Sequence, residues 1–332
     1  MRDDNNKNLV GGLPVTRRNF LRATGIVAGT AALATMPFGP LLAAERTIKI
    51  GYVSPQTGPL APFAAADQYI LQSLQRVMSN TIGIGGKTYK FEVVVKDSQS
   101  NPNRAAEVAS ELILSDKVDL MLVSSTPETT TDDFSAQLSA FKKANTEIVT
   151  GVVIPPDLTT FWTQARQQNL EPKIVSVGKA LLFPSAVETL GKSGHNLSTE
   201  VWWSPNHPFS SSLTGASSSQ LANEFTQATG KQWTQPLGFV HALFELAVDI
   251  LKRTEEVGNP EAVRDALRKT RLNTVVGPVN WSDSPIKNVA KTPLVGGQWR
   301  MQGSGKFDLV ITSNASAAVI PVGGEKQQIV YR

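Results

Sequence analysis

The sequence predicts an α/β protein built on parallel β-sheet, and three observations lead to this prediction. From Thr47 onward, short apolar segments alternate with longer amphipathic ones, and such alternation favours parallel strands joined by right-handed helical crossovers. The chain has 332 residues, which is enough for two hydrophobic cores. Hydrophobic residues make up 41% and charged residues 18% of the chain, as in globular proteins and unlike disordered ones.

The first part of the alternation runs from residue 47 to residue 123. A short strand with alternating apolar positions leads into a Pro/Gly-rich loop, SPQTGPLAP. Asn101-Pro102 is a typical helix start, because asparagine caps the first turn and proline fits the first helical position. We expect strands at 47–53, 90–96 and 118–123, and helices at 63–80 and from 102 onward.

The alternation resumes beyond residue 131. Phe134, Leu138 and Phe141 share one face of a helix. The C-terminal part contains NTVVGPVNW, GGQWRMQ and FDLVITS, which are predicted to form short strands joined by turns. Between these regions we expect strands at 147–154, 173–178 and 197–204, and helices at 157–168, 217–229, 236–254 and 260–270.

The N-terminus has the three parts of an export signal. Arg17 and Arg18 are followed by Phe-Leu and then by an apolar, uncharged run at residues 23–44 that ends in Ala-Ala. This order resembles the twin-arginine signal of bacterial export. A buried helix or a membrane anchor is the alternative, but glycines and prolines in the run weaken a helix and no second apolar segment follows. We therefore expect export by the twin-arginine translocation machinery to the periplasm, with cleavage near Ala44.

Charge and cysteine content exclude several kinds of partner and site. Residues 1–44 hold five of the 32 Lys/Arg and two of the 28 Asp/Glu, which leaves 27 against 26 in the rest and lowers the formal charge from +4 to +1. No basic stripe with interleaved aromatics remains, so we expect no nucleic-acid partner. There is no cysteine, which excludes disulfides, thiolate metal sites and a cysteine nucleophile.

No catalytic motif stands out, so we expect a protein that is not an enzyme and has no metal or cofactor. The three histidines are scattered, and there is no G-x-S-x-G elbow, H-E-x-x-H or carboxylate-rich metal loop. A Ser–His pair stays open, although nothing in the sequence singles one out. Asp132-Asp133 would suit a metal or an acid pair, but negative charge at a helix N-terminus is the plainer interpretation.

The segment GIGGKT, residues 83–88, ends like a phosphate-binding loop. That motif needs a glycine at position 81, which is Thr81 here, and it needs a strand before it and a helix after it. In this chain a helix is expected before the segment and a strand after it. We interpret the segment as a plain turn.

Several long segments resemble a known family. TIKIGYVSPQTGPLAPFA and IGIGGKTYKFEVVVKDSQSNPNRAAEVASELILSDKVDLMLVSS are similar to the first lobe of the type I periplasmic binding proteins. These are the extracytoplasmic receptors of ABC importers for branched-chain amino acids, such as leucine, and related solutes. TDDFSAQLSAFKKANTEIV and NTVVGPVNW resemble second-lobe and C-terminal segments of the same family. The resemblance covers nearly all of the chain beyond the signal.

The resemblance implies a two-lobed α/β fold with Rossmann-like lobes that close over a small solute and deliver it to ABC permease subunits in the membrane. The solute would be a branched-chain amino acid-like molecule, an amide or an organic acid. The predicted division is a signal peptide at 1–44, an incomplete first lobe at 45–130, and residues 131–332, which hold the second lobe, the hinge and segments that pack on the first lobe.

The resemblance also assigns ligand contacts, in two loops that leave the carboxyl ends of strands, where ligands of open parallel sheets bind. Backbone amides and hydroxyls in the second loop would hold a carboxylate, and an aromatic side chain in the first loop would form a wall. Each position also fits ordinary turn chemistry. The implied contacts are Thr57, Gly58 and Phe63 in the first loop and Ser124, Ser125 and Thr126 in the second.

The second-lobe segments depart from those of the amino-acid binders. The family has a tyrosine after the strand that matches 147–154, and an acid that pairs with the ligand ammonium after the strand that matches 173–178. The first stretch here ends in Ile154-Pro155, and the second continues into Lys179. A lysine at the site would repel an ammonium group and favour an anion, so our hypothesis is an organic acid or another solute that is not an amino acid. The alternative is that Lys179 points to solvent.

A cluster of aromatic residues beyond the last of these strands has two interpretations. Trp202, Trp203 and Phe209 could form the wall of a site for an aromatic ligand, or they could belong to the hydrophobic core. Core packing is the plainer interpretation.

An apparent internal deletion lies near Thr130-Thr131. In the family, the strand that ends in the Ser/Thr loop continues through the rest of the first lobe before a segment like TDDFSAQ follows. Two or three strand–helix units, roughly 60–90 residues, are therefore missing. We expect an exposed sheet edge, exposed apolar helix faces and a poorly guided hinge, and whether the chain folds and binds normally stays open.

Three alternatives to an importer component remain from the sequence. The same fold serves ligand-sensing receptors that report to a membrane partner. An exported enzyme is a second alternative, although no catalytic constellation supports it. A non-functional product of the internal deletion is the third.

Overall fold

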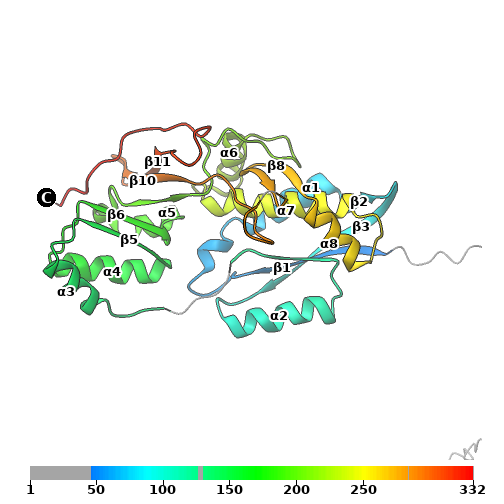
Figure 1. The fold of residues 1–332 in the computed structure, drawn as a ribbon, viewed down its shortest axis with the longest axis horizontal. Helices are drawn as coiled ribbons and strands as arrows, with labels where there is room; N and C mark the ends of the chain where they lie inside the picture. The colour runs from blue at the N-terminus through cyan, green and yellow to red at the C-terminus, as the bar shows by residue number, and fades with distance from the viewer. Residues whose placement is uncertain (1–45, 126–129, 283, 332) are drawn as a thin grey trace, which may run out of the picture. The chain divides into compact units, whose positions relative to one another are not determined.

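The computed structural model describes residues 46–125, 130–282 and 284–331. They form two larger β-sheets with helices packed on them and a two-stranded ribbon, β8 (Arg271–Thr274) with β9 (Gly277–Asn280) (Figure 1). Within these ranges no helix is both long and apolar enough to span a bilayer. The predicted signal peptide, residues 1–44, lies outside the described residues.

The first sheet has the strand order β2-β3-β1-β4. β1 pairs in parallel with β3 and with β4, whereas β2 runs antiparallel to β3. Gly85 and Gly86 form the turn between β2 and β3 with φ of 56° and 77°. The GIGGKT segment is therefore a turn only at these two glycines, because Gly83 pairs with Thr88 and Ile84 with Lys87 in a hairpin, and the strand that precedes the turn, β2, was not predicted. The strands are β1 (Thr47–Ser54), β2 (Thr81–Ile84), β3 (Lys87–Asp97) and β4 (Leu120–Val123).

Helices cover both faces of this sheet because successive side chains of a strand point to opposite sides. Ile50 and Tyr52 of β1 are buried in the core that includes helices α1 and α7. Val53 is buried against α2, which lies on the other side of the sheet (Figure 1). The helices of this lobe are α1 (Asp67–Met78), α2 (Pro102–Leu114), α6 (Ser218–Thr229), α7 (Gln235–Arg253) and α8 (Pro260–Arg268).

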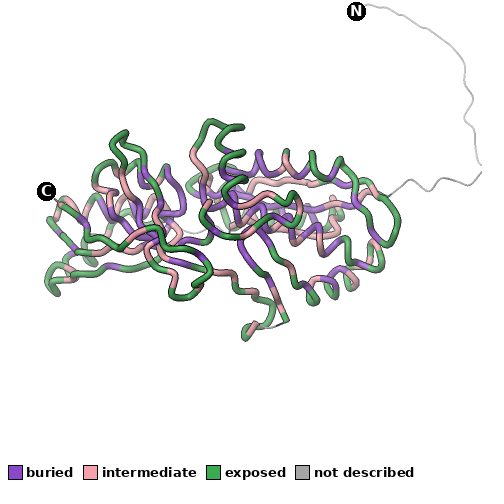
Figure 2. The backbone as a smooth tube through the Cα atoms, turned by 90° about the horizontal axis from the view of Figure 1, so that it is seen from above, coloured by how far each residue is buried: buried purple, intermediate pink, exposed green. Residues whose placement is uncertain are grey.

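A distant part of the chain thus completes the core of the first lobe. Trp203, Phe244 and Val276 are buried in the same cluster as the residues of β1. A Cβ atom added to Gly238 of α7 would lie 2.1 Å from Cγ of Trp203, so only glycine allows the indole to pack this close to the helix. In Figure 2, buried and exposed positions alternate along the coils of the helices, as expected for helices with one apolar face.

The second sheet has the strand order β11-β10-β7-β6-β5. β5, β6 and β7 are parallel, and β10 runs antiparallel to β7 and β11. Its core contains Leu138, Trp162 and Trp299. The elements are α3 (Ser135–Lys143), β5 (Ile148–Val153), α4 (Pro155–Gln167), β6 (Ile174–Lys179), α5 (Pro184–Glu188), β7 (Ser198–Val201), β10 (Val295–Met301) and β11 (Phe307–Ser313).

The chain passes from the first sheet to the second between β4 and α3. The main-chain N–H of Thr131 donates to Asp157 Oδ1 (3.0 Å) and that of Phe134 to Gln164 Oε1 (2.8 Å), so the segment is fastened to α4 from Thr131 onward. The carboxylate of Asp133 accepts from the N–H and hydroxyl of Ser135. Asp133 therefore acts at the start of α3, as predicted for the Asp132-Asp133 pair; the observed contacts concern Asp133 alone.

β4 is one of the two edge strands of the first sheet, and β5 is one of the two edge strands of the second. Val152 of β5 is 71% exposed and Ile148 is 65% exposed, and Leu114 of α2 is 73% exposed. Single exposed apolar side chains are common on protein surfaces, but an unpaired edge strand with exposed apolar residues can pair with another chain. For the first lobe, the expected features are the edge at β4, where Val123 is 42% exposed, and the exposed apolar side chain of Leu114 on α2. The internal deletion itself stays a prediction.

Two element boundaries differ from the predicted ones for tertiary reasons. The helix expected from residue 63 begins at Asp67, because residues 61–64 form a separate 3₁₀ turn that buries Phe63. The strand expected to end at residue 204 ends at Val201, because the N–H of Trp202 donates to the side chain of Gln235 on α7 (2.7 Å) instead of to a neighbouring strand.

Candidate functional site

The carboxyl ends of β1 and β4 bring the two predicted ligand loops together. Val53 and Val123 are paired in the parallel ladder, and the N–H of Ser124 donates to the carbonyl of Val53 (3.1 Å). The loop after β1 and the loop after β4 therefore begin side by side, at the side of the sheet where its parallel strands have their carboxyl ends. Ligands of parallel sheets bind at such an edge.

The loop after β1 is held by side chains from the end of β3. Asp97 accepts from the N–H and hydroxyl of Thr57, with the hydroxyl 2.7 Å from Oδ2. Although partial burial acts in the opposite direction, hydrogen bonds from Thr57 and from neighbouring N–H groups hold the pKa of Asp97 below its usual value. A Cβ atom added to Gly58, where φ is +85°, would lie 2.7 Å from the Ser100 hydroxyl, so the loop needs glycine there.

The loop after β4 begins with two half-buried serines, Ser124 and Ser125. The hydroxyl of Ser124 donates to Oγ of Ser54 at 3.2 Å. Ser54 is fully buried and donates in turn to Asp67. Thr126, the third predicted contact of this loop, lies outside the described residues. Ser124, a predicted ligand contact, is therefore connected through Ser54 to the buried carboxyl group of Asp67. No feature of the sequence singled out this acid.

Asp67 is the first residue of α1 and is 3% exposed. It accepts from the Tyr52 hydroxyl at 2.9 Å and from the Ser54 hydroxyl at 2.5 Å. Burial raises the pKa of Asp67 to about 6, and the two hydrogen bonds offset only part of that effect. Burial and the charge of Asp67 also raise the pKa of Tyr52, so this tyrosine stays a hydrogen-bond donor.

Phe63 is packed against the second lobe instead of lining an open wall. It is 4% exposed, and its ring centroid lies 4.8 Å from that of Phe183 in an edge-to-face arrangement. The cluster that they share joins the loop after β1 to the segments after β5 and β6, and its buried members are Leu60, Phe63, Ile154, Leu182 and Phe183.

A cavity of about 380 Å³ opens beside this cluster. Its volume falls within the range of small-molecule sites. Residues of both lobes line it, including Pro62 and Ala65 from the first, Phe183, Pro184, Ser185 and Glu188 from the second, and Phe225, Lys231, Gln232 and Thr234 from the segment that returns to the first lobe.

Lys179 ends β6 and faces Phe63. Its Nζ atom lies 5.7 Å from the centroid of the Phe63 ring, within the range of a cation–π contact. Its backbone is left-handed, with φ of 65°, and its N–H donates to Glu200 Oε1 (2.9 Å). The Lys179 ammonium and the Glu200 carboxylate therefore both belong to the region between the lobes, although the sequence analysis had pointed only to the lysine.

The aromatic cluster divides between core and surface. Trp203 is fully buried, with its ring centroid 5.9 Å from that of Trp233, so the core interpretation holds for this residue. Trp202 is 39% exposed and packs edge-to-face on Phe239, which contacts the Phe63 cluster. Phe209 lines a separate open hollow together with Trp202.

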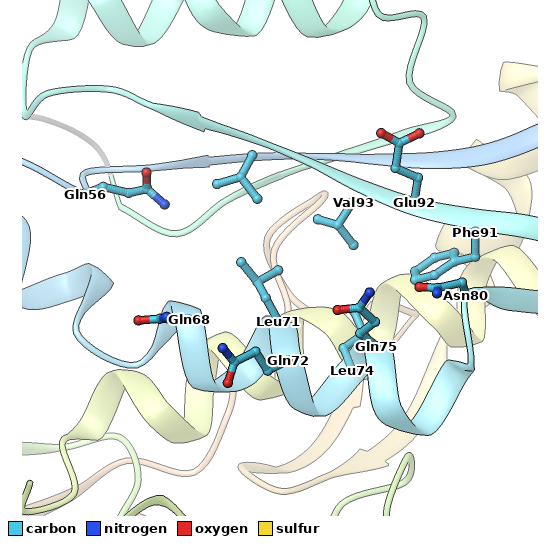
Figure 3. Close-up of a pocket in the computed structure, with 11 residues that line it drawn as sticks. Gln56, Gln68, Leu71, Gln72, Leu74, Gln75, Asn80, Phe91, Glu92 and Val93 are labelled. Carbon is cyan, nitrogen blue, oxygen red and sulfur yellow. The ribbon is translucent and has the colours of Figure 1, made fainter. Parts of the chain in front are cut away.

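A second groove lies within the first lobe between α1 and β3 (Figure 3). Its volume is about 540 Å³, and Gln68, Gln72 and Gln75 line it from successive turns of α1 opposite Phe91 and Val93 of β3. Among the described residues, all that line this groove belong to the first lobe. Closure of the two lobes over a solute would not enclose it, so we place the candidate site at the strand ends.

The structure also brings together a Ser–His pair of the kind that the sequence left open. Oγ of Ser211 lies 2.7 Å from Nε2 of His241, and both residues are almost fully buried. Burial lowers the pKa of His241 to about 4. Because neither side chain is accessible to a substrate, we interpret the pair as structural. The described residues contain no group of three or more potential metal ligands.

Sequence reasoning missed the residues that approach the site from distant segments. Asp67, Phe183, Glu200 and Phe239 belong to four different elements or loops, and no local motif marks any of them. A buried apolar environment around Asp67 could not be inferred from its neighbours, because aspartate is common in the first turn of a helix for its charge alone.

The comparisons with known proteins agree with this architecture. A family model described as periplasmic binding protein matches residues 47–130 and 122–305, more than half of the chain. The chain therefore belongs to the periplasmic binding protein family, a family of binding proteins and not of enzymes, and this confirms the family predicted from the sequence. Such membership implies an extracytoplasmic protein. A search of curated protein sequences finds no significant match.

Solved structures show the same two-lobed fold at low sequence identity. A leucine-binding protein, LivK, from Thermotoga maritima is 16% identical with a TM-score of 0.64, over 81% of this chain and 99% of that one. LivJ from Streptococcus pneumoniae in complex with isoleucine is 14% identical with a TM-score of 0.58, over 80% and 100%. A solute-binding protein from Rhodopseudomonas palustris in complex with 3,4-dihydroxybenzoic acid is 13% identical with a TM-score of 0.57, over 83% and 99%.

Proposed function

We propose that this chain is the extracytoplasmic substrate-binding component of an ABC importer. It captures a small solute between its lobes and passes it to membrane permease subunits after export through the twin-arginine route. Membership of the periplasmic binding protein family and the two adjoining loops at the ends of β1 and β4 support this role. The apparent deletion near Thr130-Thr131 remains part of the proposal as a feature that limits closure.

The solute class that we propose is an organic acid with an apolar or aromatic body. The observation that carries this choice is the Lys179 ammonium, which faces Phe63 between the lobes. A cation suits a carboxylate because the opposite charges pair, and the exposed ring of Trp202, which packs on Phe239 beside the Phe63 cluster, offers aromatic surface to the apolar body. Ser124 and Ser125 would add hydrogen bonds to the same carboxylate, as would Thr126.

Isothermal titration calorimetry of the purified chain with benzoate, 3,4-dihydroxybenzoate, leucine and isoleucine tests this choice. We expect the aromatic acids to bind more tightly than the amino acids. Lys179→Met should weaken benzoate binding at least about tenfold, whereas Lys252→Met, at the exposed end of α7, should leave it unchanged. Tight leucine binding that survives Lys179→Met would contradict an organic acid as the solute.

A second candidate, an amino-acid-like solute, is favoured by Glu200. Its carboxylate lies at the same strand end as Lys179 and would accept hydrogen bonds from a ligand ammonium, the task of the acid that the family has after the strand matching 173–178. Glu200→Gln separates the two candidates. It should abolish leucine binding if leucine is the solute, and it should leave benzoate binding intact or stronger if an organic acid is.

A further inference from the structure

A line of hydroxyl groups connects Ser124 to a buried carboxyl group. The Ser124 hydroxyl donates to Ser54 Oγ (3.2 Å), and the Ser54 hydroxyl donates to Asp67 Oδ2 (2.5 Å). The Tyr52 hydroxyl donates to the other oxygen of Asp67 (2.9 Å). Tyr52, Ser54 and Asp67 are buried and Ser124 is half-buried, so the line runs from the interior of the first lobe to the edge where the proposed solute binds.

The number of protons in this line fixes the direction of each hydrogen bond. A hydroxyl has one proton to donate, and an ionised carboxylate can only accept. When Asp67 is ionised, Ser54 and Tyr52 both give their protons to it, so each has only lone pairs left for Ser124. To keep its hydrogen bond to Ser54, Ser124 must then donate inward, and in that arrangement it offers a lone pair to the cleft.

Protonation of Asp67 allows the whole line to reverse. The acid O–H then donates to Ser54, the Ser54 hydroxyl donates to Ser124, and the Ser124 proton turns toward the cleft. Every oxygen in the line keeps a partner in both arrangements, so no buried group is left unpaired. The side chain that meets the solute thus changes from acceptor to donor without a change in backbone structure.

We propose that Asp67 is a positioning residue that decides whether Ser124 offers a donor or an acceptor to the solute, and that carboxylate solutes bind best when Asp67 is protonated. This inference rests on the proposed function, because it takes Ser124 as a ligand contact. It adds a specificity determinant that lies outside the ligand loops.

The surroundings of Asp67 allow it to titrate in the range of ordinary binding experiments. Burial raises its pKa to about 6, and the Ser54 and Tyr52 hydroxyls oppose the shift only in part. From β1 the titratable group that faces Asp67 is Tyr52, whose pKa is itself raised by burial.

Other acids and histidines on the neighbouring elements are engaged elsewhere. On α7, which packs on α1, His241 bonds to Ser211, and Glu245 bonds to Ser212 and Val275. On α6, Glu224 accepts from Tyr69 at 3.4 Å. At the end of β3, Asp97 holds the loop of Thr57, and Ser124, the residue after β4, contributes its hydroxyl to the line.

A first experiment needs no ligand. The ¹³C signal of the Asp67 carboxyl is followed by NMR from pH 4 to pH 8 in the full chain and in Ser124→Ala. We expect a titration near pH 6 that moves to higher pH in the variant, because the alanine can no longer donate into the line that supports the ionised form. A titration below pH 5, or an identical midpoint in both proteins, would overturn the inference.

A second experiment uses benzoate as the probe, since a simple carboxylate stays ionised from pH 5 to pH 8. We expect the wild type to bind benzoate about tenfold more tightly at pH 5 than at pH 8. Asp67→Asn should keep the tight binding at pH 8, because its amide N–H donates to Ser54 as the protonated acid does. Ser124→Ala should bind weakly and without pH dependence, and Asp265→Asn, an exposed acid on α8, should behave like the wild type.

The outcomes separate this inference from the proposed function. Benzoate binding that is independent of pH, or that keeps its pH dependence in Asp67→Asn, refutes the role of Asp67 but leaves the binding function intact. Circular dichroism would show whether Asp67→Asn folds. If it does not, the pH dependence of benzoate binding in the wild type, compared with that in Ser124→Ala, tests the role of Asp67 instead. If no solute of the panel binds at any pH, the proposed function fails, and the NMR titration still decides whether the line responds to Asp67.

Discussion

Two buried carboxyl groups of the first lobe, Asp67 and Glu245, have very different donors. Within the described part of the chain, the donors to Asp67 are two side-chain hydroxyls, those of Tyr52 and Ser54. Glu245, on α7, accepts from the main-chain N–H groups of Ser212 and Val275 as well as from the Ser212 hydroxyl. Burial raises the pKa of both acids.

This difference in donors determines which of the two carboxyl groups, Asp67 or Glu245, can change the direction of its hydrogen bonds. A main-chain N–H can only donate, so the oxygens of Glu245 must accept in every state of the protein. They fasten the loop around Ser212 and the turn between β8 and β9 to α7. The hydroxyls around Asp67 can donate or accept, so that network can reverse. Glu245 is an anchor of the fold, and Asp67 is placed to respond to pH beside the candidate site.

The largest expected effect is the loss of the anchor. Glu245→Ala should lower the free energy of unfolding by about 3–5 kcal/mol, because it opens a cavity and removes the acceptor of the buried Val275 N–H as well as that of the N–H and hydroxyl of the exposed Ser212. Urea denaturation at pH 7 measures it, with the exposed Glu255→Ala as control. A loss below about 1 kcal/mol would mean that the anchor is not required.

The histidine beside the anchor should make this region sensitive to acid. Burial lowers the pKa of His241 to about 4 from its usual 6.5, so its contribution to stability is complete above pH 6.5 and is lost as the pH falls toward 4. Between pH 7 and pH 5 the wild type should lose about 2 kcal/mol through this group. His241→Gln should reduce this loss of stability between pH 7 and pH 5. Urea denaturation curves of the variant that keep the full pH dependence of the wild type would show that His241 is not its source.

Asp67 should have the opposite pH dependence. Its folded-state pKa of about 6 lies above the usual 3.8, so burial of the charge costs nothing below pH 3.8, and the cost becomes complete as the pH rises past 6. Asp67→Asn should therefore gain about 1.5 kcal/mol of stability relative to the wild type between pH 5 and pH 8. The difference between the two proteins at each pH isolates this group from the histidines. A constant difference would show that Asp67 does not titrate in this range.

The smallest expected effects compare one hydroxyl from each cluster. Ser54→Ala and Ser212→Ala should each cost about 1 kcal/mol at pH 7. Only Ser54→Ala should also move the titration of Asp67 to higher pH, because Ser54 is a donor that favours the ionised form. Equal pH profiles for the two variants would remove the distinction between a reversible network and a fixed one.

The sequence predicted most strands and helices of the described chain, because their apolar periodicity is strong. It also predicted the loops at the ends of β1 and β4, since parallel strands place their carboxyl ends at one edge. It could not predict that Phe63 packs on Phe183, because that contact depends on how the loop after β1 meets the second lobe. Glu200 was missed for a similar reason, since it reaches the end of β6 from the neighbouring strand.

The assigned contacts of the loop after β4 stay predictions, and so does the division of the chain at residues 44 and 130. The structure connects one of those contacts, Ser124, to the interior of the lobe. No spacing in the sequence indicates that connection, because Ser54, Asp67 and Ser124 lie on three different elements.

By itself, the sequence determined the family, the α/β class and the order of the elements. These depend on local periodicity and on motifs that stay recognisable in a linear chain. Only the tertiary structure decided which polar groups are buried together. Whether Asp67 is an ordinary helix-start charge or a titratable group behind Ser124 depends on the desolvation that β1, β4 and α1 produce when they pack, and no single segment carries that information.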